Sequence, residues 1–140
     1  MNRLTCAEQR EFARANCLKL GKKREVEIPF NSPWCREYFK LSGDINDDLH
    51  GDDGDFCWAQ GTGTITLIGA MMSIHMPDFI AMKLEISFRS PINIGHTVLM
   101  TMHWVKEKGG IAIVEVELAR MDGTIAADGK VILGPKPKKP

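Results

Sequence analysis

The second half of the chain alternates polar and apolar residues along several short stretches. This alternation predicts strands at residues 83–89, 98–104, 111–119 and 125–133, each with one packed face and one face that is wet or shared. Glycine-containing turns at residues 108–110 and 121–124 join the last three of these strands. We therefore expect a meander of long antiparallel strands.

The first half of the chain predicts helices and one further strand. Residues 6–20 alternate charged and apolar side chains as an amphipathic helix does, and we expect this helix to lie outside the main core. Residues 25–30 predict a strand, in which Pro29 argues for an edge or an end of a sheet. Ser32 can cap a short helix that begins at Pro33.

A long apolar stretch separates these elements from the meander. Residues 64–76 are apolar nearly all round and are bounded by Gly63 and Pro77, which predicts a buried helix. An antiparallel sheet that wraps this helix would bury it on all sides and would use the apolar face of the sheet. The expected fold is therefore the α+β hotdog arrangement, an antiparallel sheet around a central hydrophobic helix.

The length of 140 residues is that of one domain. We assign residues 22–134 to the hotdog domain, residues 1–21 to an N-terminal helical extension and residues 135–140 to a flexible tail. A single sheet of this kind has two edge strands and leaves its helix incompletely covered. We therefore expect the protein to form a homodimer.

Composition narrows the range of functions. Eighteen Lys and Arg residues balance eighteen Asp and Glu residues, so the chain has no basic excess with which to bind nucleic acid. The four cysteines form no CxxC pair, which favours a reducing, cytoplasmic location. The N-terminus lacks the apolar core of a signal peptide, and no apolar run reaches the length of about 20 residues that crosses a bilayer. We expect a soluble protein without a membrane partner.

Candidate chemistry lies just before the predicted buried helix. Asp44, Asn46 and His50 stand within seven residues in a segment rich in glycine and aspartate. A histidine of ordinary pKa can take or give a proton, and a carboxylate beside it can share that work or hold its tautomer. Gln60 and Gly61 stand where the helix would start, and free backbone N–H groups at that end point at any oxygen ahead, such as a thioester carbonyl.

The pattern Tyr-Phe-x-Leu-Ser-Gly-Asp-x-Asn, followed by Leu-His, resembles the signature of the MaoC-like (R)-specific enoyl-CoA hydratases, which are hotdog proteins. The resemblance extends over about residues 25–133 and includes a Phe-x-x-Pro-x-x-x-Gly stretch at residues 88–95. It implies that Asp44 and His50 activate water for addition to a trans-2-enoyl thioester and that Asn46 orients them. It also implies that the backbone amide of Gly61 polarises the thioester carbonyl.

This sequence departs from the family pattern in three ways. The Asp-to-His segment is one residue longer and lacks its proline, and Gln60 replaces the histidine of a His-Gly pair. Only nine residues separate His50 from Gln60, where the family has a longer segment. We expect a wider or rearranged pocket in which Asp44 and His50 are catalytic and Asn46, Gln60 and Gly61 bind the substrate, a thioester of coenzyme A or of acyl carrier protein.

Other readings of the same residues stay open. A hotdog thioesterase would use Asp53 or Asp55 to position water, and a noncatalytic protein would keep the acyl-thioester pocket without turnover. Asp44, Asn46, Asp48 and Asp55 also fall at ligand positions of an EF-hand loop, but the glycine of the sixth position and the glutamate of the twelfth are missing. We expect neither a metal nor a cofactor.

Overall fold

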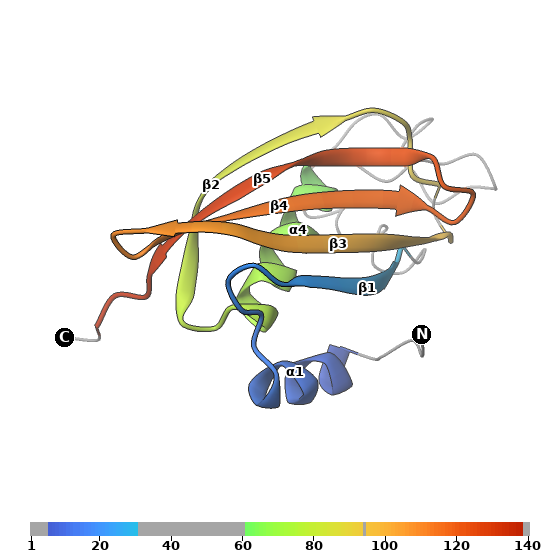
Figure 1. Cartoon of the computed structure of the whole chain (residues 1–140). Helices are drawn as coiled ribbons and strands as arrows, with labels where there is room; N and C mark the ends of the chain where they lie inside the picture. The colour runs from blue at the N-terminus through green and yellow to red at the C-terminus, as the bar shows by residue number, and fades with distance from the viewer. Residues whose placement is uncertain (1–5, 31–60, 94, 139–140) are drawn as a thin grey trace.

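The computed structural model describes residues 6–30, 61–93 and 95–138. A five-stranded antiparallel sheet, in the order β1-β3-β4-β5-β2, curves around the long helix α4 (Figure 1). None of the helices in these ranges is long and apolar enough to cross a bilayer. The elements are α1 (Cys6–Ala15), β1 (Lys23–Pro29), α4 (Gly61–His75), β2 (Phe79–Phe88), β3 (Thr97–Lys108), β4 (Ile111–Arg120) and β5 (Ile125–Pro135).

The core lies between the inner face of the sheet and α4. Ile68 and Met72 of α4 are fully buried, and the inner face of β3 and β4 supplies alternate buried side chains to the same cluster. Burial of this apolar surface is the main force that holds the helix in the sheet. The α+β hotdog arrangement expected from the sequence is therefore confirmed.

The strands extend beyond their predicted bounds. β2 begins at Phe79 rather than at residue 83, because a bulge between Ala81 and Lys83 interrupts the alternation without ending the pairing with β5. β5 continues to Pro135, the first residue of the expected tail, and the N–H of Lys136 donates to the backbone oxygen of Asp78 at 3.0 Å.

The N-terminal helix is shorter than expected and contacts the core. α1 ends at Ala15; the N–H of Asn16 makes a last helical bond to the oxygen of Phe12, and the side-chain amide of Asn16 donates to the same oxygen at 3.2 Å. Leu18 then enters the core cluster, and its N–H donates to the backbone oxygen of His75 at 2.9 Å. The segment after α1 thus joins the C-terminal end of α4 to the start of β1.

One glycine of β5 is required by close strand packing. Gly129 pairs with Ile86 of β2, and a Cβ atom added to it would overlap the backbone oxygen of Glu85. Backbone cannot move aside as the end of a long side chain can. The position therefore accepts only glycine without a shift of β2 against β5.

We expect Gly129→Ala to lower the free energy of unfolding by about 1 to 3 kcal/mol, the usual cost of overpacking. Gly69→Ala is the matched control, because a Cβ added at Gly69 of α4 meets no atom within 4 Å and alanine favours a helix. Urea unfolding at neutral pH measures both. Equal stability of the two variants would contradict the packing argument.

Candidate functional site

The predicted site residues fall in two groups. Asp44, Asn46, His50 and Gln60 lie outside the residues that the structure describes. Gly61 is the first residue of α4, so the helix does begin where the sequence placed the polarising amide. The first-turn N–H groups of a helix have no partner within the helix and can donate to an oxygen ahead of it.

A cavity of about 300 Å³ opens beside this end of α4. Thr64, one turn into the helix and only 2% exposed, forms one wall. Phe88 at the end of β2 is half exposed and forms part of another wall. The remaining lining residues are Arg89, Ser90, Pro91, Ile92 and Ala126. This volume is at the lower end of the range for small-molecule pockets.

Hydrogen bonds hold the wall that follows β2. The N–H groups of Arg89 and Ser90 both donate to the oxygen of Ala126, at 2.8 and 3.2 Å. The hydroxyl of Ser90 donates to the oxygen of Ile125 at 2.8 Å, and Nε of Arg89 donates to Asp128 at the same distance. Backbone and side-chain hydrogen bonds therefore hold residues 89 and 90 against the start of β5.

The second motif of the sequence lies in this region. Phe88 and Pro91 line the cavity, whereas Gly95 lies farther along, with φ of +93°. Its N–H donates to the oxygen of Phe30 at 2.5 Å, and the N–H of Phe30 donates to the oxygen of His96 at 2.9 Å. A residue with a side chain is strained at that φ, which explains the glycine of the motif.

A second cavity, of about 320 Å³, adjoins the first and shares Ile92 with it. Its mouth carries His96 and the ion pair between Arg120 and Asp122, whose atoms lie 3.0 Å apart. The carboxylate of Asp122 offsets the positive charge of Arg120 there. Arg120 is already paired with a carboxylate, so this cavity is not built as an anion site.

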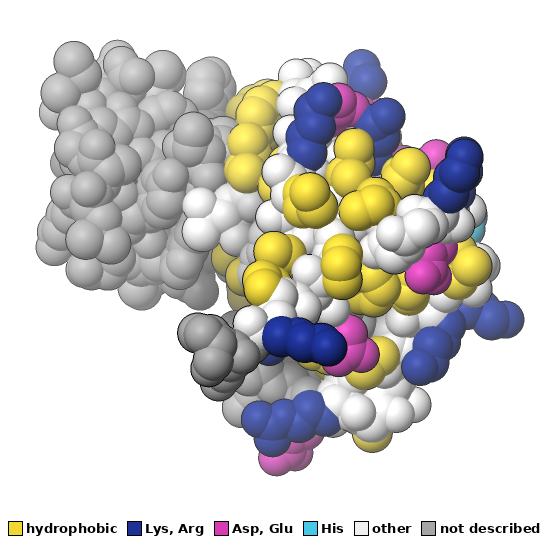
Figure 2. Space-filling view, turned by 90° about the vertical axis from the view of Figure 1, so that its left-hand side faces the viewer, with side chains coloured by type: hydrophobic (Ala, Val, Ile, Leu, Met, Phe, Trp, Pro, Cys, Tyr) yellow, Lys and Arg dark blue, Asp and Glu magenta, His cyan; other side chains and the backbone are white. Residues whose placement is uncertain are grey.

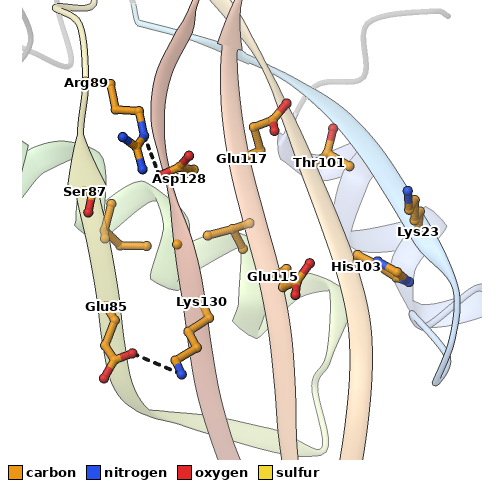
Figure 3. Close-up of a pocket in the computed structure, with 13 residues that line it drawn as sticks. Lys23, Glu85, Ser87, Arg89, Thr101, His103, Glu115, Glu117, Asp128 and Lys130 are labelled. Atoms are coloured by element: carbon orange, nitrogen blue, oxygen red, sulfur yellow. Dashed lines mark hydrogen bonds and ion pairs between the residues drawn. The ribbon is translucent and has the colours of Figure 1, made fainter.

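A larger hollow, about 830 Å³, lies on the outer face of the sheet (Figure 3). Its rim is crossed by ion pairs from Arg89 to Asp128 and from Lys130 to Glu85, at 2.8 and 3.3 Å. Hydrogen bonds from Lys83 and Lys130 lower the pKa of the Glu85 carboxyl. These groups are already paired and open to water, where fixed charges stabilise a reaction far less than in an enclosed site. The cavity at α4 is therefore the better candidate.

A buried histidine stands at the opposite end of α4. Nδ1 of His75 lies 3.1 Å from Nη1 of Arg24, and His75 is 1% exposed. Burial, and then the charge of Arg24, lower the pKa of His75 to about 4. A guanidinium only donates, so Nδ1 accepts and the ring proton is on Nε2. His75 is therefore neutral near pH 7, far from the candidate cavity.

The sequence missed some of the residues that build the cavity. Thr64 and Ser90 are polar residues at the ends of apolar elements, and Thr64 in particular is a buried threonine in an apolar helix. A threonine within an otherwise apolar helix was the feature of the sequence that could have indicated the cavity. Within the described residues, no three His, Cys, Asp or Glu side chains lie close enough together to hold a metal ion.

Known proteins resemble this chain in structure but not detectably in sequence. No protein-family model matches the chain, and no curated protein matches its sequence. Solved structures match well. R-hydratase PhaJ1 from Pseudomonas aeruginosa superimposes with a TM-score of 0.73 at 18% identity, over 86% of this chain and 84% of that one. The chain has the hotdog fold.

Two further structures agree. The (R)-hydratase from A. caviae, involved in PHA biosynthesis, gives a TM-score of 0.72 at 17% identity and covers 85% of this chain and 98% of its own. The HadBC complex from Mycobacterium tuberculosis, a 3R-hydroxyacyl-ACP dehydratase, gives 0.65 at 13% identity over 84% and 98%. At such identities the likeness establishes the hotdog fold, while the reaction depends on the site residues.

Proposed function

We propose that this hotdog protein is a hydratase or dehydratase of 2-enoyl and 3-hydroxyacyl thioesters, carried by coenzyme A or by acyl carrier protein. The observation that supports it is the start of α4 at Gly61 beside a cavity bounded by Thr64 and Phe88, with the motif that carries Asp44 and His50 earlier in the sequence. Donors at a helix start suit an oxygen that gains charge during the reaction.

In the proposed mechanism, Asp44 and His50 remove a proton from water as it adds to C3 of the enoyl thioester. The C2 carbon is reprotonated from the same face, and the N–H of Gly61 donates to the enolate oxygen. Asn46 orients the pair, and Gln60 contacts the substrate beside Gly61. Dehydration of the 3-hydroxyacyl thioester follows the same steps in reverse.

The names of two similar structures bear on the carrier. One is a 3R-hydroxyacyl-ACP dehydratase complex, and another, smu.793 from Streptococcus mutans, is bound to acetyl CoA with a TM-score of 0.57 at 16% identity. Both carriers present a thioester, so we propose either as the partner. A cytoplasmic location accords with four cysteines that show no pairing pattern.

The test is incubation with crotonyl-CoA, following the absorbance of the conjugated enoyl thioester and the release of free thiol in one sample. Loss of the enoyl thioester without free thiol is the expected result. Release of thiol would replace the proposal with a thioesterase that uses Asp53 or Asp55. Thermal stabilisation by crotonyl-CoA without either reaction would indicate a noncatalytic binding protein.

A further inference from the structure

The cavity at the start of α4 and the second cavity meet at one side chain. Of the residues that the structure describes, only Ile92 lines both. Ile92 is 5% exposed and belongs to the hydrophobic core cluster. A packed side chain between two hollows forms a wall, because close-packed neighbours leave it little room to move aside. Ile92 therefore stands where a chain that enters the first cavity would reach the second.

The backbone on either side of Ile92 is fixed to the sheet. Before it, the N–H of Ser90 donates to the oxygen of Ala126 in β5 at 3.2 Å. After it, the N–H of Gly95 donates to the oxygen of Phe30, which follows β1. Because the short connection from β2 to β3 is held at both ends, the position of the Ile92 wall is defined by the fold.

The volumes of the two cavities suggest what this wall does. The first cavity, about 300 Å³, is as small as the smallest small-molecule pockets, whereas the first and second cavities joined would fall well inside the usual range. The second cavity suits an apolar chain, since its lining includes the buried Val98 and the apolar Met121. A longer acyl chain would therefore need the space beyond Ile92.

Apolar side chains also gather on the surface where β2 begins, at the other end of that strand from the cavity (Figure 2). Ile80 and Met82 are 42% and 63% exposed there. Side chains on an open surface can contact an acyl chain of any length, but they cannot exclude one. A limit on chain length requires an enclosed wall such as Ile92.

We infer that Ile92 limits the length of the acyl chain, so that the protein prefers four-carbon thioesters to eight-carbon ones. The inference rests on the proposed function, in which the thioester carbonyl lies at the first turn of α4, beside the first cavity. The acyl chain then extends from the side of Thr64 toward Ile92. One methylene group more or less in a hydrophobic pocket changes discrimination by about tenfold or more, so a short wall excludes longer chains strongly.

Binding of two saturated ligands, butyryl-CoA and octanoyl-CoA, measures this limit without any turnover. Isothermal titration calorimetry of the wild type should give a dissociation constant for octanoyl-CoA at least about tenfold above that for butyryl-CoA. Ile92→Ala opens the wall and should abolish or reverse this preference through tighter binding of octanoyl-CoA. Ile92→Val removes a single methyl group, so it is the variant less prone to unfold, and it should shift the ratio a few fold in the same direction.

Ile28→Ala is the matched control. Ile28 lies on β1 in the same core cluster, is 4% exposed and lines neither cavity. The variant removes the same atoms from the core, so it should lose stability but keep the ratio of the two dissociation constants within about twofold of the wild type. Equal affinity of the wild type for both ligands would overturn the inference. A ratio left unchanged by both Ile92 variants, with circular dichroism showing them folded, would do the same.

Hydration of crotonyl-CoA and of trans-2-octenoyl-CoA separates the length limit from the proposed reaction. We expect the wild type to hydrate mainly the shorter thioester and Ile92→Ala to hydrate both. Equal hydration of the two by the wild type would keep the hydratase and overturn the length limit. A binding preference that depends on Ile92, without hydration of either thioester, would keep the length limit and overturn the hydratase. Binding of neither saturated ligand would overturn both.

Discussion

Replacing His50 by alanine is expected to lower the rate of crotonyl-CoA hydration by about 10² to 10⁴, the usual contribution of a general acid or base. Asp44→Ala should have an effect of the same order, because the two residues act on one water molecule. The loss should appear in kcat, because in the proposed mechanism both residues act on the reacting water. Initial rates over a range of substrate concentration measure kcat and KM.

The control for this prediction is Asp48→Asn, two residues before His50 in the same acidic segment but without a place in the proposed mechanism. It should retain the hydration rate within a few fold. Near-normal hydration by His50→Ala or Asp44→Ala would remove that residue from the mechanism. If Asp55→Ala alone abolished turnover, the thioesterase would become the better account.

The regular elements were predictable because their periodicity reflects a single boundary between core and water. β3 and β4 alternate buried and open side chains along most of their length, as the polar and apolar residues of the sequence do. α4 is apolar on nearly every side because the sheet wraps it, and its predicted bounds differ from the observed Gly61–His75 by three residues at one end and one at the other.

Features that depend on distant residues were not predictable. Leu18 is part of the core only because its segment crosses the end of α4, and nothing in residues 6–20 marks that crossing. The contact of Arg24 with His75 joins residues 51 positions apart. Gly129 resembles any strand glycine until β2 is laid against it. Local sequence patterns indicate which residues are buried, whereas these contacts depend on how distant parts of the chain are arranged in the fold.

The candidate site also has parts that were predictable from the sequence and parts that were not. The motif around Asp44 and His50 was visible because it is continuous in sequence, and those residues stay predictions. The start of α4 was visible as a change of hydrophobic pattern, although the helix begins at Gly61, three residues before the predicted start at Thr64. The cavity beside it was not visible, because Thr64 and Phe88 meet there only once β2 has paired with β5.

Acid should destabilise the protein through His75. Its pKa is about 4 in the folded chain, against about 6.5 when unfolded, because burial and then Arg24 disfavour the charged ring. Below pH 6.5 the unfolded chain gains a proton that the folded chain does not take up. The free energy of unfolding therefore decreases as the pH is lowered. The loss should reach about 3 kcal/mol at pH 4, where the folded state begins to bind the proton as well.

The variant His75→Gln should remove this part of the pH dependence, because a neutral amide can accept from Arg24 and does not titrate. Urea unfolding of wild type and variant at several values between pH 7 and pH 4 measures the difference, in which the effect of the carboxyl groups cancels. His103→Gln is the control, since His103 lies on the outer face beside the open hollow. Parallel curves for wild type and His75→Gln would show that His75 is not the buried group that acid must charge. A wild type that loses about 3 kcal/mol more than the variant between pH 7 and pH 4 would tie the contact of α4 with Arg24 of β1 to the protonation of one side chain.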